Sequence, residues 1–453
     1  MGMEIAERAL ALCDDDEAQV TVTRERSLLS RFARSHPTQA TSVDDLTVNV
    51  LILRDGHVGT AETNLTDDEG LRAAVARARS AANAAAATGA ERDHPGLPAA
   101  PDAYPHHDGW DAETARLEPA AAGTALATAF AIAAEHRFEA FGIWTAGDVE
   151  TTIASSAGVR ARDRVTDSYM KVICRDESGR SGWGAAAGRD LAALDAAGIA
   201  REAAAKVPRE DPIEIPAGEY PVVLEPDAVG ELLLYLGYLA FNGLAHAEGR
   251  GALEGRLGTR VAAPAINLAD SPRSALTLPR AFDQEAIGKK PLPLIQDGIA
   301  HRVVHDLRSA ARAGTVTTGH AVAPGGSPDG PVPTNLVLAG GGAADSAELV
   351  APIERGLYVT RLWYVNPVHA KQTLLTGTSR DGTYLIEDGR ITQPVRDVRF
   401  TDSVLRILEA TEALTMRQRL VSSADFYHRR FALGVVCPAL RAQGFRVTGV
   451  KPA

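Results

Sequence analysis

Residues 230–239 read Gly230-Glu231-Leu232-Leu233-Leu234-Tyr235-Leu236-Gly237-Tyr238-Leu239, and they decide how the second half of the chain is interpreted. A strand-like run, Tyr220 to Leu224, comes before them, and the glycine-rich Glu248-Gly249-Arg250-Gly251 comes after. The leucines recur at helical spacing, and Asp227 stands where a helix N-cap is expected. This pattern predicts a packed helix over residues 227–241.

The overall composition is typical of a soluble globular protein. At 453 residues the chain is too long for one ordinary core, so two or more domains are expected. Apolar residues make up 45% and charged residues 23%, which argues against disorder. The net charge is −11, from 47 basic and 58 acidic residues. Binding to nucleic acid needs clustered Lys and Arg, and the sequence has no such run. Direct contact with nucleic acid is therefore not expected.

The spacing of the cysteines and the acidic residues near position 15 favour a cytoplasmic location. Cys13, Cys174 and Cys437 are far apart and odd in number, which predicts free thiols in a reducing cytoplasm. Acidic residues at 14–17 do not suit a signal peptide, and no apolar run approaches the ~20 residues of a membrane span. We therefore expect a cytoplasmic protein with no membrane contact.

The first half alternates strands with alanine-rich helices. Asp55-Gly56 predicts a hairpin turn between strands at 47–53 and 57–63, and Thr66-Asp67-Asp68-Glu69 matches a capping box that opens a helix to about residue 87. Other expected helices cover residues 3–13, 117–134 and 190–206, and other expected strands cover 141–146, 150–155, 160–173 and 183–187.

Residues 91–109 are rich in proline and lack periodicity, so they are expected to form a linker or long loop. His94, His106 and His107 lie in this stretch. Because no acid or cysteine stands near them at ligand spacing, we expect them to be solvated rather than to bind metal.

A second domain is predicted after the prolines at 208–216. Beyond them, short β-like segments are punctuated by Asp-Gly turns at 297–298, 381–382 and 388–389, with helices expected only at 227–241 and near 346–354 and 403–410. The fold class is therefore α+β. An N-terminal domain of strands and Ala-rich helices is expected over residues 1–207, and a largely antiparallel β domain over 208–453.

Three histidines form the main alternative site. His301 and His305 are four residues apart, which places them on one face of a helix or of a strand. Arg302 stands where a zincin motif carries its glutamate, and the preceding Asp-Gly turn favours a strand within a hairpin. With His320 as a third ligand they are low-ranking candidates for a metal site, and a turn hydrogen bond is the simpler role for His320.

Two further sets of residues have both a functional and a structural interpretation. His246, Glu248 and Arg250 are weak candidates for contacts with a substrate groove, although a loop ion pair is the simpler interpretation. No basic residue stands next to Cys437 in the sequence, so a buried structural thiol is expected there. No catalytic residue is assigned.

The sequence resembles the TldD/PmbA family of peptidases over most of its length, most strongly from about residue 218 onward. The markers are Phe282-Asp283-Gln284-Glu285, Leu294-Ile295-Gln296-Asp297-Gly298, Thr318-Gly319-His320-Ala321, Arg355-Gly356-Leu357-Tyr358-Val359-Thr360, Thr376-Gly377-Thr378 and Ile386-Glu387-Asp388-Gly389-Arg390-Ile391. Ala286 replaces a usual glycine, and residues 363–375 have lost the glycine-rich spacing of the family.

The resemblance places the HExxxH zinc helix of the catalytic subunit on residues 234–239. Leu234 and Leu239 stand for its histidines and Tyr235 for its glutamate, while Cys437 falls near a cysteine that helps to bind zinc. A catalytic zinc needs about three protein ligands, and this helix offers Glu231 alone. The chain is thus more similar to PmbA, also called TldE, than to TldD.

The resemblance implies a non-catalytic subunit that has no cofactor of its own. Its expected partner is a TldD-like subunit that carries zinc, and the pair is expected to cleave unfolded peptides or leader peptides. Two alternatives stay open: an independent metal-dependent hydrolase that uses His301, His305 and His320, and a homodimeric peptide-binding scaffold.

Overall fold

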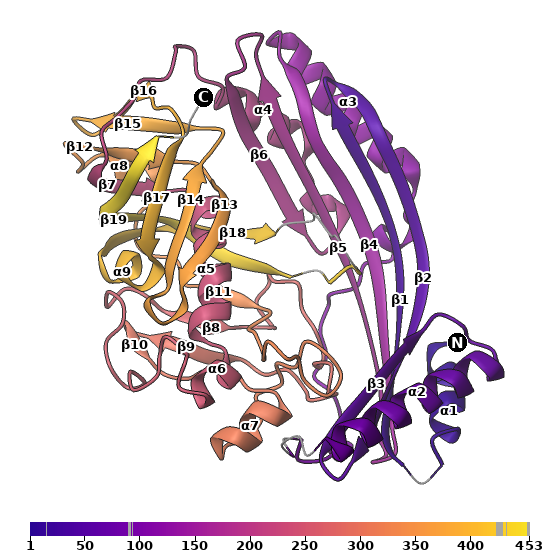
Figure 1. The fold of residues 1–453 in the computed structure, drawn as a ribbon. Coiled ribbons are helices and arrows are strands. Elements are labelled where there is room, and N and C mark those ends of the chain that lie inside the picture. Colours follow the sequence, from indigo (N-terminus) through magenta and orange to yellow (C-terminus); the bar gives the residue numbers. More distant parts are fainter. Residues whose placement is uncertain (15, 89–91, 93, 423–428, 432, 451–453) are drawn as a thin grey trace.

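The computed structural model describes residues 1–14, 16–88, 92, 94–422, 429–431 and 433–450. Its first sheet has six antiparallel strands in the order β3-β2-β1-β4-β5-β6 (Figure 1). The strands are β1 (Glu17–Ala33), β2 (His36–Arg54), β3 (His57–Thr63), β4 (Glu139–Ser155), β5 (Arg160–Arg175) and β6 (Ser181–Gly188).

These strands are longer than the sequence predicts. β1 was missed, β2 begins eleven residues before the predicted start at residue 47, and β4 joins two segments predicted to be separate. The outer part of β2 is exposed and the facing part of β1 is mostly half-buried, so these residues show no apolar alternation. Polar cross-strand contacts occur there instead, such as the Arg24–Asp44 pair at 3.1 Å.

Four helices pack on the first sheet: α1 (Gly2–Ala11), α2 (Asp68–Ala87), α3 (Pro119–Glu135) and α4 (Ala196–Ala205). Helices α3 and α4 cover its outer face with small side chains that pack around Trp144 and Met170 (Figure 1). The capping box predicted at Thr66 is wrong by one residue, because Asp67 accepts the capping bond from the Gly70 N–H at 2.7 Å. Over 190–206, a short turn at Leu191–Ala193 precedes α4 instead of one continuous helix.

The second sheet is largely antiparallel, as predicted, and the α+β class is confirmed. Within the described chain it has thirteen strands: β7 (Gly218–Leu224), β8 (Leu268–Asp270), β9 (Leu292–Gln296), β10 (Ile299–Ala300), β11 (Leu336–Leu338), β12 (Arg355–Val359), β13 (Leu362–His369), β14 (Leu374–Ser379), β15 (Thr383–Glu387), β16 (Arg390–Pro394), β17 (Val398–Ser403), β18 (Thr411–Ser422) and β19 (Gly434–Val450).

Among the described residues, the α-helices beside this sheet are α5 (Pro226–Ala240), α6 (Gly243–Ala247), α7 (Leu307–Ala313), α8 (Ser346–Val350) and α9 (Val404–Glu409). Helix α8 ends four residues earlier than predicted. The predicted Asp-Gly turns at 297–298 and 388–389 are confirmed, and all four residues have the left-handed backbone that such hairpin turns require. We propose that the prolines at 208–216 mark the boundary between two structural units.

The inner face of the first sheet is turned toward the second sheet (Figure 1). Its residues alternate with those that α3 and α4 cover, because side chains on a strand point to opposite faces in turn. Trp183 on this face stacks on Arg361, which immediately precedes β13. Further down, Ile153 packs in one cluster with Phe282. These contacts fix the position of the second sheet against the first.

The linker predicted at 91–109 has no helix or strand in its described residues. The prediction that its histidines are solvated is wrong for two of the three. The side chain of His94 is buried beside Glu285, and His107 contacts Asp163 at 2.7 Å. The linker folds onto the protein, so these rings gain carboxylate partners that sequence spacing does not reveal. His106 is exposed.

In the part of the chain that the structure describes, no helix combines the length and the apolar character that crossing a bilayer requires.

Candidate functional site

Helix α5 is the element on which the function of the second half depends. It follows β7 directly and begins at Pro226, a residue whose ring suits the first turn of a helix. Leu232, Leu233 and Leu236 are buried in the main core. The helix is therefore packed as predicted, and its apolar side faces the second sheet.

The predicted N-cap of α5 is wrong. Glu225 occupies the N-cap position, and its carboxylate accepts bonds from Lys206 Nζ and from the Tyr358 hydroxyl, both at 2.6 Å. Asp227 lies in the first turn and pairs with Arg419. A carboxylate in a first turn is favourable because the helix dipole is positive there.

The three positions that correspond to zinc-helix residues carry packing side chains. Leu234, Tyr235 and Leu239 are partly buried against the main core. The Tyr235 hydroxyl donates to the Val365 carbonyl at 2.6 Å, which ties α5 to β13. The helix is held in place by apolar contact and one hydrogen bond at the positions where a metal would need ligands.

Glu231 is the ligand-type side chain of α5 nearest to these positions, since Asp227 lies one turn earlier and pairs with Arg419. Burial raises its pKa to about 7, and the nearby Arg361 opposes that rise. A carboxyl with this pKa is about half protonated at pH 7 and largely protonated below it, and a metal ligand must be deprotonated. Glu231 alone therefore cannot form a zinc site.

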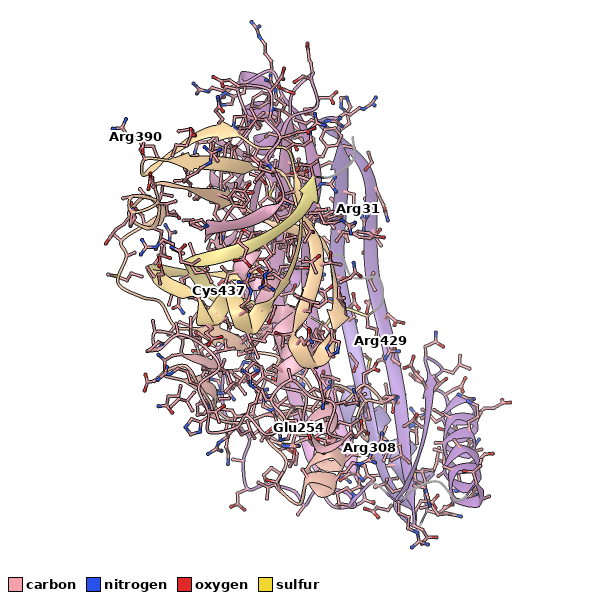
Figure 2. All side chains as sticks on the ribbon, turned by 60° about the vertical axis from the view of Figure 1, so that its left-hand side comes forward. Arg31, Glu254, Arg308, Arg390, Arg429 and Cys437 are labelled. Atoms are coloured by element: carbon pink, nitrogen blue, oxygen red, sulfur yellow. The ribbon has the colours of Figure 1, made fainter. Side chains whose placement is uncertain are left out.

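Cys437 lies inside the second sheet (Figure 2) and is fully buried, as the sequence predicts. Its Sγ donates to the carbonyl of Pro226 at 3.3 Å. Burial raises the pKa of the thiol to about 12. The sulfur is therefore a protonated packing group, whereas metal binding and nucleophilic attack need the thiolate.

The histidine triad of the alternative interpretation is not assembled. His301 is exposed and lies just after β10, which ends at Ala300. His305 is buried, and its ring nitrogen Nδ1 lies 3.2 Å from Ser309 Oγ. His320 is buried between Thr318 and Asp270. Among the described residues, no group of three or more His, Cys, Asp or Glu side chains is arranged to hold a metal ion.

The hairpin predicted after the Asp297-Gly298 turn is present, but its strand β10 ends at Ala300 and does not run through His301 to His305. Asp306 and Ser309 form a reciprocal capping box, with the Ser309 N–H donating to Asp306 Oδ1 at 2.8 Å. This box caps α7, which begins at Leu307, so the chain enters a helix two residues after His305 instead of continuing as a strand. Burial lowers the pKa of both His305 and His320.

Two of the three substrate-groove candidates, Glu248 and Arg250, form an ion pair. Glu248 accepts from Arg250 at 2.5 Å and from Arg312 at 2.9 Å. His246 lies in α6, two residues before Glu248, which caps the C-terminal end of that helix. This matches the simpler interpretation, a loop ion pair between α6 and α7, and a role in substrate binding stays a prediction.

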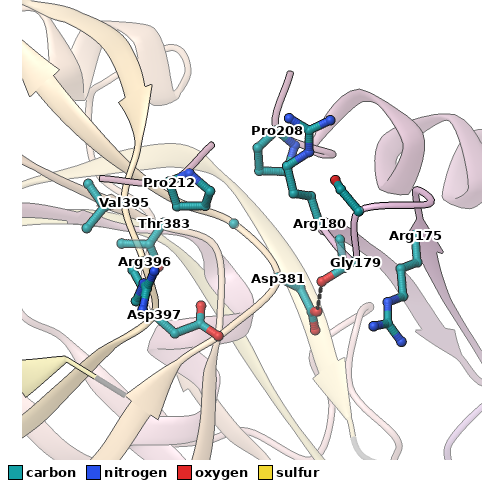
Figure 3. Close-up of a pocket in the computed structure, with 13 residues that line it drawn as sticks. Arg175, Gly179, Arg180, Pro208, Pro212, Asp381, Thr383, Val395, Arg396 and Asp397 are labelled. Carbon is teal, nitrogen blue, oxygen red and sulfur yellow. Dashed lines mark hydrogen bonds between the residues drawn. The ribbon is translucent and has the colours of Figure 1, made fainter. Parts of the chain in front are cut away.

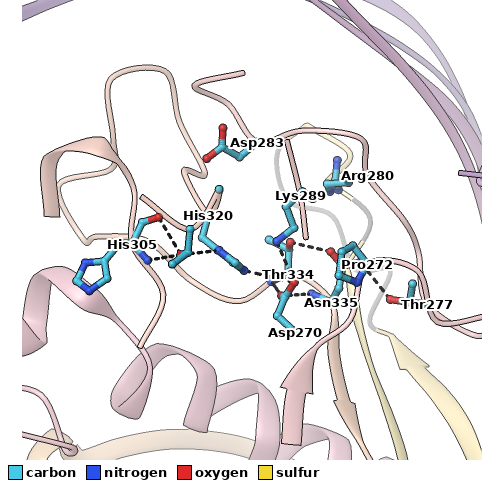
Figure 4. A network of polar contacts seen from close by, with 12 residues as sticks. Asp270, Pro272, Thr277, Arg280, Asp283, Lys289, His305, His320, Thr334 and Asn335 are labelled. Atoms are coloured by element: carbon cyan, nitrogen blue, oxygen red, sulfur yellow. Dashed lines mark hydrogen bonds and ion pairs between the residues drawn. The ribbon is translucent and has the colours of Figure 1, made fainter. Parts of the chain in front are cut away.

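The sequence markers Phe282–Glu285 and Thr318–Ala321 meet in a buried polar cluster (Figure 4). Asp270 is at its centre: its Oδ1 lies 3.0 Å from Lys289 Nζ and 3.3 Å from His320 Nε2. These are ion contacts rather than well-aligned hydrogen bonds. Asp270 Oδ2 also accepts the N–H groups of Thr334 and Asn335. We call Asp270, Lys289, His320, Thr334 and Asn335 the polar node.

Electrostatics inside the polar node are balanced between opposite charges. Burial favours a raised pKa at Asp270, but Lys289 and His320 outweigh it and hold that pKa below its ordinary range. Burial lowers the pKa of Lys289, and Asp270 opposes this. The sequence reading singled out His320 but missed Asp270 and Lys289. The only available signal was a lysine, Lys289, shortly after the Phe282–Glu285 marker.

An exposed aromatic surface lies beside α5. Tyr238 on the helix and Trp363, Tyr364 and Val368 on β13 are all more than a third exposed, and we call these four residues the aromatic surface. Within the described chain β13 pairs with β14 alone, so it is an edge strand. Trp363 is supported from behind by Arg361, which stacks on both Trp363 and Trp183. The sequence reading did not single out this surface.

A cavity of about 600 Å³ lies between the β5–β6 turn and the second sheet (Figure 3). Ser181 donates to Asp381 at 2.6 Å across it, and Asp381 also pairs with Arg361. Arg175, Arg180 and Arg396 give its lining a basic character. The Ser181–Asp381 bond joins the two sheets at this cavity, so we assign the cavity to the junction between them.

Comparison with known proteins agrees with the architecture. Models of the PmbA/TldA metallopeptidase match residues 18–82 as domain 1, 111–209 as the central domain and 217–449 as the C-terminal domain. A metalloprotease of Methanothermobacter thermautotrophicus is 25% identical over 208 residues, which cover 45% of this chain and 44% of that protein. A metalloprotease TldD homolog of Haemophilus influenzae is 25% identical over 249 residues, covering 53% and 50%.

The chain thus spans about half the length of the curated relatives that it matches. Solved structures show the same fold over nearly the whole chain. TldE from Thermococcus kodakarensis superposes with a TM-score of 0.85 at 21% identity, covering 99% of this chain and 100% of that one. A protein from Thermotoga maritima described as a modulator of a DNA gyrase gives a TM-score of 0.83 at 20% identity, covering 98% and 99%. The chain therefore belongs to the PmbA/TldD family of metallopeptidase-related proteins.

Proposed function

We propose that this chain is the non-catalytic subunit of a two-chain zinc peptidase. The observation that carries the proposal is the face of α5, which presents Leu234, Tyr235 and Leu239 where a catalytic subunit would need zinc ligands. Cys437, the remaining candidate, is a buried thiol bonded to the Pro226 carbonyl. These residues do not fit zinc, so no catalytic step is assigned to this chain.

The proposed partner is a TldD-like subunit with an intact HExxxH helix, which would hold the zinc and carry out hydrolysis. The role of the present chain is to wall off the cleft and admit only extended peptides. The aromatic surface beside α5 supports this role, because exposed rings on an edge strand can contact a partner or an unfolded peptide. One acceptor of that edge, the Val365 carbonyl, is already taken by Tyr235.

We place this complex in the cytoplasm. Cys13, Cys174 and Cys437 are all buried free thiols, which suits a reducing compartment. Two-chain assembly and leader-peptide or unfolded-peptide substrates are further parts of the same proposal.

Coexpression with a TldD-like chain tests the proposal. Size-exclusion chromatography is expected to show a mixed complex that digests unfolded casein, while this chain alone leaves casein intact. Mutating the glutamate of the partner's HExxxH motif should abolish digestion without dissolving the complex. Digestion by this chain alone, or a stable homodimer that ignores the partner, would overturn the proposal.

The matched variant on this chain is Trp363→Ala combined with Tyr364→Ala. It removes two exposed rings from the aromatic surface and leaves α5 unchanged, so we expect weaker complex formation or slower digestion. Ile391→Ala, which alters an exposed apolar side chain on β16, serves as the control and should leave both unchanged.

A further inference from the structure

A short piece of chain between β18 and β19 crosses to the inner face of the first sheet. We call Arg429–Phe431 the strap. Arg429 lies beside the first sheet (Figure 2) and pairs with Glu62 on β3. Arg430 is 4% exposed, and the ring of Phe431 lies 3.8 Å from the Arg280 guanidinium. All three residues therefore contact other parts of the protein.

Arg430 occupies a pocket in which each group faces a polar partner. Its Nε and Nη2 donate to the two carboxylate oxygens of Asp167, at 2.6 and 2.7 Å. Its Nη1 donates to Thr145 Oγ1 at 2.9 Å, and its backbone N–H donates to Glu25 Oε2 at 2.8 Å. A two-bond contact of this kind is specific for a guanidinium. We call Glu25, Thr145, Gly147 and Asp167 the arginine pocket.

The arginine pocket is built into the sheet itself. Gly147 on β4 lies directly opposite Asp167 on β5, and Thr145 is two residues away on the same face. A side chain at Gly147 would collide with the guanidinium, because a Cβ there would lie 2.1 Å from Arg430 Nε. The shape of the sheet thus leaves room for an arginine.

Neighbouring groups also orient the pocket. The Thr145 hydroxyl donates to the Leu28 carbonyl at 2.7 Å, which leaves its lone pairs facing the guanidinium. Ser27 donates to the other oxygen of Glu25 at 2.7 Å. These bonds run between residues of the first sheet and do not involve the strap, so the pocket keeps its geometry whichever arginine fills it.

Asp167 makes an empty pocket unfavourable. A buried carboxylate without a cation is strongly destabilising, and Asp167 is 4% exposed. Departure of Arg430 would deprive Asp167 of its two-bond partner and leave Arg280 as the other cation near it, so an incoming guanidinium is the favoured replacement. The strap competes as part of the same chain, at an effective concentration on the order of millimolar.

We infer that the arginine pocket is a recognition subsite for an arginine within an extended peptide, and that the strap fills it in the free chain. A peptide is favoured over free arginine because Glu25 accepts a hydrogen bond from the backbone N–H of the arginine. In addition, Glu62 and Arg280 contact the residues before and after it, which are Arg429 and Phe431 in the strap. The preferred sequence is accordingly basic, arginine, aromatic. The inference rests on the proposed function, since it adds a substrate preference to a peptide-binding subunit.

The test uses the purified full chain without a partner, so its outcome is independent of complex formation and of zinc. A fluorescent peptide with the sequence Ala-Arg-Arg-Phe-Ala is compared with one that carries neutral citrulline at the central position. Arg430→Ala should bind the arginine peptide at least about tenfold more tightly than the citrulline peptide, because only arginine restores the charged pair. Wild type should bind the arginine peptide at least about tenfold more weakly than Arg430→Ala, because the strap competes.

The matched control is Arg430→Ala combined with Asp167→Asn, which should bind both peptides equally. Equal affinity of the Arg430→Ala chain for the two peptides, or an arginine preference that survives Asp167→Asn, would overturn the inference. Arg430→Lys covers the case in which Arg430→Ala does not fold, because lysine keeps the charge and loses the two-bond contact. The arginine peptide should raise the Tm of Arg430→Lys and the citrulline peptide should not; equal shifts would also overturn the inference.

Discussion

Helix α5 and the polar node are two buried regions of the same domain, and one is held by apolar packing while the other is held by charged side chains. The face of α5 carries leucines and tyrosines where the resemblance places metal ligands. The polar node keeps a lysine, an aspartate and a histidine in contact within a fully buried site. The difference teaches that buried charged side chains occur in this domain where they join loops, whereas the face of α5 is held by apolar packing.

The largest expected effect comes from breaking the polar node. Lys289→Met leaves Asp270 as a buried charge without its main cation, so the free energy of unfolding should fall by about 3–5 kcal/mol. Lys371→Met, which breaks a half-exposed pair with Glu254, should cost no more than about 1 kcal/mol. Urea unfolding measures both. Equal losses would show that the polar node is not the structural support inferred here.

The packing of α5 is tested next. Leu233 is fully buried, so Leu233→Ala should lower the free energy of unfolding by about 2–5 kcal/mol through lost contacts and a cavity. Tyr238→Ala removes an exposed ring from the same helix and should change stability by less than about 0.5 kcal/mol. Similar costs at the two positions would contradict the assignment of α5 as a one-sided packed helix.

The stability of the protein should depend on pH through two buried acids next to the polar node, Asp283 and Glu285. Burial raises the pKa of Asp283 to about 7 and that of Glu285 to about 8, with Asp306 adding to the rise at Glu285. An acid with a raised folded-state pKa contributes stability below its unfolded pKa and loses it as pH rises through the folded value. Stability should therefore fall between pH 5 and pH 8.

Glu285→Gln replaces one of these two titratable carboxyl groups by an amide that does not titrate. Relative to wild type, the variant should gain at least about 1 kcal/mol on going from pH 5 to pH 8. Unfolding curves at the two pH values give the comparison, and Glu412→Gln at an exposed pair is the control. Curves for wild type and Glu285→Gln that stay parallel with pH would refute the buried-acid assignment.

The smallest effect is expected at the bond that joins α5 to β13. Tyr235→Phe keeps the ring and deletes the hydroxyl that donates to Val365, so it should cost about 1 kcal/mol. Differential scanning calorimetry can resolve the change. A neutral or stabilising result would mean that this bond does not hold the edge strand against the helix.

Local patterns predicted part of the fold well. The apolar spacing of α5, the Asp-Gly turns and the class of each domain follow from neighbouring residues, and the structure confirms them. Strand β1 was missed because its second half mixes charged and apolar side chains that are mostly half-buried, so no alternation marks it, and its pairing with β2 and β4 joins residues far apart in sequence. The strand predicted through His305 ends at Ala300, because Asp306 caps a helix, α7, just beyond His305.

The site was less predictable because its contacts join distant residues. Asp270 and Lys289 are nineteen residues apart, and Arg430 meets Asp167 from the far end of the chain. No spacing rule links such pairs. The resemblance to a known family marked the loops that meet at the polar node, but the cation and carboxylate that join them are visible only in three dimensions.

Metal analysis of the purified chain tests the central claim most directly. We expect this chain alone to hold far less than one zinc per molecule after refolding or purification in zinc, and a mixed complex with a TldD-like chain to hold zinc that depends on the histidines of that partner. Stoichiometric zinc on this chain alone, lost in the His301→Ala and His305→Ala double variant, would contradict the account.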